Sequence, residues 1–176
     1  NRKRVIIILL DRDSITELIL GDSPLISGFD DLEEQVQPNG FDLTLQEIRE
    51  LNSGGYMGKG PNQRLLSNSD ILAFDYQGWV HLNPGSYLIT FNEICHLPLD
   101  LMALGKPRSS LLRSGVTIST AVWDAGYRGR SQSLLTVLNP YGFGVQQNAR
   151  LLQLIFIRLE HTTIRGYQGN FINENI

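Results

Sequence analysis

Cysteine is nearly missing from this sequence, in which Cys95 is the only cysteine among 176 residues. A single thiol cannot form an intramolecular disulfide, and it leaves no cysteine cluster to hold zinc. Small secreted domains depend on such cross-links, whereas a chain of this length can bury a core without them. The shortage therefore favours an intracellular, cytoplasmic protein.

An excess of basic charge is also lacking. The chain has 15 lysines and arginines against 18 aspartates and glutamates, which gives a formal net charge of −3. Nonspecific binding to nucleic acid requires a positive field over part of the surface. The composition argues against a nucleic-acid polymer as partner, although a few arginines at one place could still hold a phosphorylated small molecule.

Long apolar runs are the third absence. The run at residues 5–10 follows three basic residues and imitates the opening of a secretory leader, but it has only six residues before Asp11. A membrane-spanning helix needs about 20 apolar residues, and a leader has a longer apolar core. We therefore expect no membrane association and no cleaved leader.

The sequence does contain a series of short strand-like segments separated by glycine, proline and asparagine. No repeat or shift in composition marks a boundary, so we expect residues 1–176 to form a single domain. Short apolar or alternating runs predict strands at residues 5–10 (buried), 79–82, 87–91, 116–123, 133–138 and 151–159. Regularly spaced short strands favour a mostly β barrel or sandwich.

Signals for helices and loops are fewer. Ser14 and Glu17 fit a capping box that opens a short helix, and Gly21 can close it. Residues 52–62 are rich in Gly, Ser and Asn and predict a mobile surface loop. Residues 165–176 are polar and predict a tail that orders only on binding.

The densest group of phosphate-binding residue types is at residues 107–115, which read PRSSLLRSG. Arg108 and Arg113 offer forked donors, and Ser109 and Ser110 add hydroxyl groups on one predicted helical turn. The first amides of such a turn also face an anion. The alternative is an ordinary capped turn with solvated arginines.

A second segment, TAVWDAGYRG at residues 120–129, ends an apolar run on Asp124. A carboxylate held rigidly at the end of a strand can orient or deprotonate a water molecule, as a general base does in hydrolysis. The alternative is an aspartate that caps its own turn.

Two more segments carry polar residues beside strands. Residues 37–43 (QPNGFDL) lead from a Pro/Gly turn into a strand and present Asp42, while residues 148–154 (NARLLQL) place Arg150 and Gln153 in an apolar strand. A polar side chain in such a strand needs a partner. Alone, these segments indicate a turn and a structural hydrogen bond.

Taken in this order, the four segments resemble the dUTPase/dCTP deaminase superfamily. Its motifs are similar to a QP-x-x-x-D-L strand, an R-S-S-L-x-R-x-G turn, an A-x-x-D-x-G-Y/F-x-G hairpin and an N/G-x-R-x-x-Q-L strand. The likeness extends to residues 10–13, the 84–85 turn and residues 167–169, so it spans nearly the whole chain. The C-terminal segment is more similar to the deaminase-type tail, and the chain as a whole is most similar to the archaeal-type dUTPases on the dCTP deaminase-like branch.

This resemblance implies a mostly β, distorted jelly-roll subunit with one or two short helices. It further implies a homotrimer with active sites between subunits, and an enzyme that hydrolyses dUTP to dUMP and pyrophosphate. Mg²⁺ is the implied cofactor, held mainly through the triphosphate and not directly by the protein. A contact through water near Asp42 is left open.

The resemblance also assigns roles to matching residues. Asp124 would orient the attacking water, and Tyr127 would pack beneath the deoxyribose and exclude a 2′-hydroxyl. Backbone groups of residues 116–122 would read the pyrimidine edge. Arg108, Ser109 and Ser110 would hold the triphosphate, and Gln153 would add a hydrogen bond to it. Arg113 would brace the turn or a neighbouring subunit. Residues 165–176 would close over the substrate as a flexible C-terminal lid through Tyr167, Gln168 and Gly169.

Deaminating members carry a proton-shuttling glutamate on the strand after the hairpin. Here Leu134 takes the ungapped position, and Thr136 takes it when Asn139 is aligned with the family's asparagine; neither is a general acid or base at neutral pH. Residues 125–159 contain no Asp or Glu, and Cys95 lacks the cysteine partner of zinc deaminases. Hydrolysis is therefore predicted. Deamination of dCTP by another shuttle, and a regulatory nucleotide-binding protein without catalysis, remain alternatives.

Overall fold

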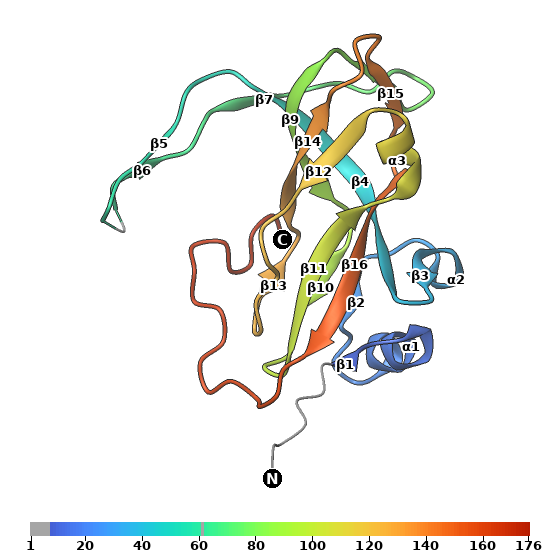
Figure 1. The fold of residues 1–176 in the computed structure, drawn as a ribbon, viewed down its shortest axis with the longest axis vertical. Coiled ribbons are helices and arrows are strands. Elements are labelled where there is room, and N and C mark those ends of the chain that lie inside the picture. The colour runs from blue at the N-terminus through green and yellow to red at the C-terminus, as the bar shows by residue number, and fades with distance from the viewer. Residues whose placement is uncertain (1–7, 61) are drawn as a thin grey trace.

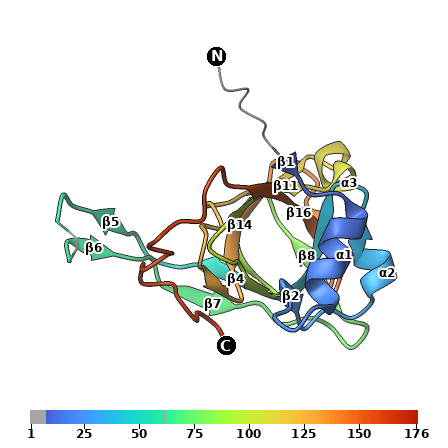
Figure 2. The ribbon, with the colours of Figure 1, turned by 90° about the horizontal axis from the view of Figure 1, so that it is seen from below.

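The structure is a computed structural model that describes residues 8–60 and 62–176. It confirms the mostly β fold: the strands curl into an open barrel, and the helices lie on one side of it (Figure 1 and Figure 2). The chain thus buries its core inside a curved sheet, and its loops and helices carry most of the candidate site.

The largest sheet has nine strands, and its main path runs in the order β1-β16-β4-β9-β14-β12. β11 also pairs with β16, and β3 and β7 pair with β4. All these pairings are antiparallel. The strands are β1 (Ile8–Leu9), β3 (Val36–Gln37), β4 (Gly40–Leu51), β7 (Ser69–Ile71), β9 (Gly85–Phe91), β11 (Leu101–Pro107), β12 (Val116–Ser119), β14 (Gln132–Val137) and β16 (Arg150–Arg158).

Three smaller sheets complete the fold. They join β2 (Ile26–Ser27), β10 (Ile94–His96) and β13 (Arg128–Gly129); β8 (Trp79–Leu82) and β15 (Phe143–Gln146); and β5 (Tyr56–Met57) and β6 (Arg64–Leu65). The β5–β6 pair is an arm that projects from the body (Figure 2). Within the predicted surface loop at 52–62, Tyr56 and Met57 are exposed and form one strand of this two-stranded arm, and residue 61 lies outside the described residues.

Side-chain alternation explains how the strands build the core. In β14, Ser133, Leu135 and Val137 are buried while the residues between them are partly exposed. β4 instead has six consecutive buried residues at its start, because both of its faces are covered there. Phe41, Phe91 and Phe156 are fully buried, and each such side chain contributes about 1.5–3 kcal/mol by leaving water.

Most predicted strands are confirmed to within two residues, at 79–82, 87–91, 133–138 and 151–159. The strand predicted at 116–123 ends at Ser119, and only an isolated bridge at Trp123 follows. Of the predicted strand at 5–10, residues 5–7 lie outside the described residues. Ile8 and Leu9 do form a strand, but they are 47% and 54% exposed because β1 lies at the edge of the sheet, so the prediction of burial is wrong for them.

The described residues contain three short helices, one more than the maximum expected. α1 (Arg12–Leu20) begins before the predicted start because Asp11, not Ser14, is its N-cap: the Asp11 carboxylate accepts a 2.9 Å hydrogen bond from the Ser14 amide. Gly21 closes it as predicted.

The other two helices are shorter. α2 (Leu32–Gln35) was not predicted, and Asp31 caps it. α3 (Ser109–Arg113) confirms the predicted helical turn. No helix among the described residues is long and apolar enough to cross a membrane.

Candidate functional site

The predicted site residues form two separate groups within one chain. Arg108 to Arg113 lie at α3, beside β4 and β16, whereas Asp124 and Tyr127 lie on the hairpin that follows β12 (Figure 1). Trp123 pairs with Ala103 on β11, and Arg108 follows five residues later along that strand. At about 3.3 Å per residue the two groups are roughly 16 Å apart along β11.

The α3 turn exposes its two serines. Arg108 is the N-cap residue with an extended backbone, and its amide donates to the Leu151 carbonyl at 3.0 Å. Ser109 and Ser110 follow in the first turn, where amides and hydroxyls lack helical partners. The Arg113 guanidinium turns back and donates to the Ser109 carbonyl at 3.4 Å. Gly115, with φ of +71°, ends the turn in a conformation that other residues avoid.

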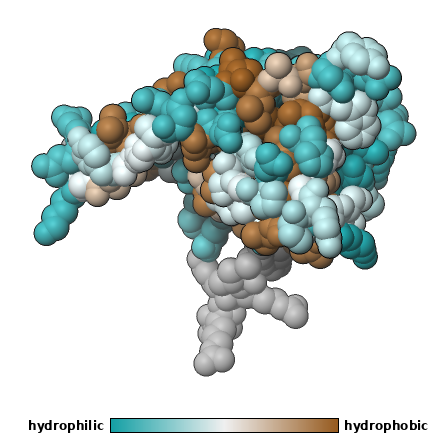
Figure 3. All heavy atoms as spheres, turned by 90° about the horizontal axis from the view of Figure 1, so that it is seen from above, coloured by the Kyte–Doolittle hydropathy of each residue, from teal (hydrophilic) through white to brown (hydrophobic). Residues whose placement is uncertain are grey.

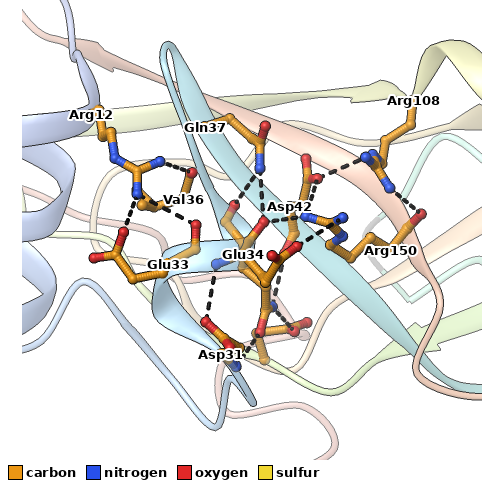
Figure 4. A network of polar contacts seen from close by, with 11 residues as sticks. Arg12, Asp31, Glu33, Glu34, Val36, Gln37, Asp42, Arg108 and Arg150 are labelled. Atoms are coloured by element: carbon orange, nitrogen blue, oxygen red, sulfur yellow. Dashed lines mark hydrogen bonds and ion pairs between the residues drawn. The ribbon is translucent and has the colours of Figure 1, made fainter.

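Asp42 is a buried carboxylate beside two arginines (Figure 4). Its side chain is 1% exposed, and its Oδ2 lies 3.1 Å from Arg108 Nε and 3.9 Å from Arg150 Nη1. These are ion-pair contacts without hydrogen-bond alignment, so among the described residues neither carboxylate oxygen accepts a hydrogen bond. Burial raises the pKa of Asp42, and the two arginines oppose that rise. The two arginines therefore stabilise this buried carboxylate through their charge.

Gln153 lies between Asp42 and Lys106, its register partners on β4 and β11. None of the described residues forms a hydrogen bond with its side chain, so the structure gives no support to a purely structural bond. Gly40 makes room for it: a Cβ at Gly40 would lie 2.9 Å from Gln153 Nε2.

Arg150 was identified only as a polar residue in an apolar strand, and the structure gives it a specific place. Besides Asp42, it contacts Glu34 of α2, with Nη2 3.3 Å from the carboxylate. Arg12 of α1 pairs with Glu33 at 2.6 Å in the same network (Figure 4). The two short helices are thereby tied to the strands that carry Asp42 and Gln153.

Glu93 is a second buried carboxylate that sequence reasoning missed. It accepts hydrogen bonds from Gln35 Nε2 at 2.6 Å, Thr44 Oγ1 at 2.6 Å and the Thr44 amide at 2.9 Å, and Gln35 also donates to the Asp42 carbonyl. Burial raises the pKa of Glu93, while these hydrogen bonds lower it in part. No local motif surrounds Glu93, because only the fold brings it behind Asp42.

Asp124 is exposed at the end of a fixed backbone segment. Trp123, 4% exposed, exchanges two hydrogen bonds with Ala103, at 2.9 and 3.1 Å. The Asp124 carbonyl accepts from the Tyr127 amide at 3.0 Å, but no described residue donates to its carboxylate. A turn-capping role for this side chain therefore has no support, and the carboxylate is free to bind a water molecule.

Tyr127 and the C-terminal segment enclose a pocket beside Asp124. The pocket has a volume of about 280 Å³, with Val122, Asp124 and Tyr127 on one side and Tyr167, Phe171 and Glu174 on the other. Ligand pockets usually span about 300–1,000 Å³, so this one is close to the lower end of that range. Gln168 is exposed on the same segment.

Glu174 was also missed by sequence reasoning. It lies in a polar tail without a local pattern, and the Tyr127 hydroxyl donates to its Oε1 at 2.7 Å. A larger pocket of about 630 Å³ lies on the other face of Tyr127, near Leu97 and Arg158, but it contains neither Asp124 nor any residue of α3. Of the residues predicted from the sequence, Asp124, Tyr127 and Tyr167 line the smaller pocket, and only Tyr127 also lines the larger one.

Metal binding by protein side chains alone finds no support in the part of the chain that the structure describes. No group of three or more His, Cys, Asp or Glu side chains there is placed to hold a metal ion. Asp42 supplies carboxylate oxygens, which Mg²⁺ prefers, but only as a single group. A metal at this position would need most of its ligands from phosphates and water.

Comparisons with known proteins agree on one family. A family model described as dCTP deaminase-like matches residues 9–159. A Methanococcoides burtonii protein named "probable deoxyuridine 5'-triphosphate nucleotidohydrolase" is 45% identical over 168 residues, covering 96% of this chain and 99% of that protein. A Methanosarcina mazei protein of the same name is 46% identical over 167 residues, covering 95% and 98%.

Two further matches are more distant. A Methanocaldococcus jannaschii protein named deoxyuridine 5'-triphosphate nucleotidohydrolase is 32% identical over 155 residues, covering 86% of this chain and 97% of that protein. The crystal structure of the 2'-deoxycytidine 5'-triphosphate deaminase from Agrobacterium tumefaciens matches with a TM-score of 0.64 at 24% identity. That match covers 85% of this chain and 48% of the deaminase chain, and it concerns the fold alone.

Proposed function

The chain belongs to the dCTP deaminase-like family, and we propose that within this family it hydrolyses dUTP to dUMP and pyrophosphate. The observation that carries the proposal is the near full-length similarity to archaeal relatives named as deoxyuridine triphosphate nucleotidohydrolases. The match to the Methanococcoides burtonii protein covers 96% of this chain, so the similarity includes the α3 turn, the hairpin and β16.

The residues on β14 favour hydrolysis over deamination. Leu134 and Thr136 hold the positions at which a deaminase glutamate is expected, and neither can exchange a proton at neutral pH. Asp124, by contrast, presents an unengaged carboxylate at the pocket. In the proposed reaction it orients a water molecule for in-line attack on the α-phosphorus, and pyrophosphate leaves.

The polar residues near α3 would hold the leaving phosphates. Arg108 supplies a forked donor, Ser109 and Ser110 supply hydroxyls, and Gln153 supplies a side-chain amide. Bound Mg²⁺ would neutralise charge on the triphosphate. Asp42 is the group through which a water ligand of that ion could be held, and its two oxygens without hydrogen bonds support this assignment.

We propose a homotrimer in which each active site is completed by a second subunit. Support comes from the separation of roughly 16 Å along β11 between the hairpin and α3: a second copy can bring its hairpin to α3, whereas one chain does not. Exposed apolar residues add to this, since Leu112 of α3 is 69% exposed and Leu138 is 68% exposed. Hydrophobic patches are visible on the face seen from above (Figure 3), and such patches often mark interfaces.

Residues 165–176 are proposed as a lid over the nucleoside pocket. The segment lies against the hairpin here, with the Tyr167 amide bonded to the Ala125 carbonyl at 2.8 Å and the Asn173 amide bonded to the Arg128 carbonyl at 2.7 Å. Because it forms one wall of the pocket, movement of this segment would widen the access for the substrate.

Deamination of dCTP is a second candidate, favoured by one observation. Glu174 places a carboxyl group at the pocket that β14 does not provide, and burial raises its pKa. Its Oε1 is already engaged by the Tyr127 hydroxyl, however, so a free proton shuttle is the less favoured role.

The two candidates differ in their products. The protein is incubated with Mg²⁺ and either dUTP or dCTP, the nucleotides are separated by ion exchange, and ammonia is assayed. The proposal expects dUMP and pyrophosphate from dUTP, with dCTP unchanged. Ammonia from dCTP would favour deamination, and binding without turnover of either nucleotide would favour a regulatory protein.

A further inference from the structure

Tyr127 is held at two points by the C-terminal segment. Its ring meets the Tyr167 ring edge to face, with centroids 5.7 Å apart, and its hydroxyl donates to Glu174 Oε1 at 2.7 Å. Only 5% of Tyr127 is exposed and Glu174 is half-buried, so this hydrogen bond is partly shielded from water. A shielded bond to a carboxylate restrains the ring more strongly than one at the surface.

The backbone around Glu174 is fixed to the hairpin as well. Glu174 forms a parallel bridge with Gly129, and its carbonyl accepts from the Arg130 amide at 3.0 Å. The Arg130 guanidinium donates to the Asn175 carbonyl at 2.7 Å. This pairing places the Glu174 side chain opposite Tyr127, so the contact follows from strand-like geometry.

Gly129 allows the two side chains to meet. A Cβ added at Gly129 would lie 2.7 Å from the Tyr127 hydroxyl and 3.1 Å from Glu174 Cγ. Any side chain there would push the carboxylate and the phenol apart. The absence of a Cβ at this position is therefore part of how the contact is built.

We propose that Glu174 is a positioning residue for Tyr127, and that their hydrogen bond sets the discrimination between deoxyribonucleotides and ribonucleotides. The inference rests on the proposed function, which puts Tyr127 beneath the sugar. A ring whose hydroxyl is anchored cannot swing aside to admit a 2′-hydroxyl. Selectivity of this kind is a difference in transition-state binding between two substrates. Loss of the anchor should therefore change kcat/KM for the ribonucleotide and the deoxyribonucleotide unequally, in favour of the ribonucleotide.

The role requires a hydrogen-bond acceptor, and it does not require a charge. Burial raises the pKa of Glu174, and the bond from Tyr127 offsets part of that rise. A glutamine at this position keeps an acceptor oxygen of the same reach. Glu174→Gln should therefore preserve the function that Glu174→Ala removes.

The test compares kcat and KM for dUTP and UTP in four proteins: the wild type, Glu174→Ala, Glu174→Gln and a control, Glu160→Ala, whose side chain is 73% exposed. Glu174→Ala should lower the kcat/KM ratio of dUTP over UTP about tenfold, as expected for the loss of one hydrogen bond. Glu174→Gln should keep most of the ratio, and Glu160→Ala all of it. An equal loss for both nucleotides in Glu174→Ala, or a Glu174→Gln protein as unselective as Glu174→Ala, would overturn the inference.

Hydrogen exchange separates this inference from the proposed function. The Asn173 amide is bonded to the Arg128 carbonyl, and its hydrogen should exchange faster in Glu174→Ala and in Tyr127→Phe than in the wild type. In the double variant the exchange rate should equal that of the single variants. Additive effects would mean that the residues act independently, which contradicts the inference. If the wild type hydrolyses neither nucleotide, the proposed function fails, and the ratio is then read from dUTP and UTP affinities by calorimetry.

Discussion

At the scale of single residues, Asp124 owes its position to the backbone before it. The backbone hydrogen bonds between Trp123 and Ala103 fix the end of the apolar segment before Asp124. Among the described residues, none donates a hydrogen bond to the Asp124 carboxylate. Asp124→Asn keeps the shape and removes the ability to accept a proton. We expect kcat for dUTP to fall about 10²–10⁴-fold with little change in affinity, measured by turnover and by nucleotide titration. Asp22→Asn, at an exposed position after α1, is the control; an Asp124→Asn protein with normal turnover would remove Asp124 from the mechanism.

Glu93 makes a residue-scale prediction about pH. Burial raises its pKa in the folded protein above the ordinary value of about 4.3. Folding then favours the protonated form, so this contribution to stability is fully present below the unfolded pKa and is lost as pH rises through the folded pKa. Between the unfolded and the folded pKa of Glu93, the free energy of unfolding should fall more steeply with pH in the wild type than in Glu93→Gln. Urea titrations across that range measure the slopes, and equal slopes would show that Glu93 does not titrate there.

At the scale of elements, the close approach of β4 and β16 depends on Gly40. A side chain there would press into the Leu154 carbonyl and lie 2.9 Å from Gln153 Nε2. Gly40→Ala should therefore separate the strands that carry Asp42 and Gln153 and lower the free energy of unfolding by about 2 kcal/mol or more. Gly54→Ala is the matched control, because nothing lies within 4 Å of a Cβ at that position. A Gly40→Ala protein as stable in urea as Gly54→Ala would contradict this reading of the strand contact.

The elements also explain what could be predicted from sequence. Buried and partly exposed residues alternate along strands such as β14, and serines and a glycine mark the α3 turn. Both elements can therefore be predicted from the local sequence. The start of α1 was misplaced because Asp11 competes with Ser14 for the cap. Glu93 and Glu174 could not be predicted as parts of the site, because each meets its partners only through contacts between distant segments, at separations of 49 and 47 residues for Thr44 and Tyr127.

For the whole molecule, the proposed sharing of each active site between two subunits can be tested by mixing two inactive variants. Asp124→Asn and Arg108→Gln should each be nearly inactive, since each removes one half of every site. Mixed and reassembled in equal amounts, they should recover about a quarter of wild-type activity, because that fraction of sites combines both intact halves from different subunits. Both variants must first elute as the wild type does in size-exclusion chromatography. If the mixture shows only the summed residual activity, then the two groups do not meet between subunits.

In the proposed reaction, water oriented by Asp124 attacks the α-phosphorus of dUTP. This step is tested by hydrolysis of dUTP with Mg²⁺ in ¹⁸O-labelled water, followed by mass spectrometry of both products. We expect one ¹⁸O atom in dUMP and none in pyrophosphate, with almost no labelled dUMP formed by Asp124→Asn. Label in pyrophosphate would place the attack at another phosphorus, and dUTP returned unchanged would contradict hydrolysis altogether.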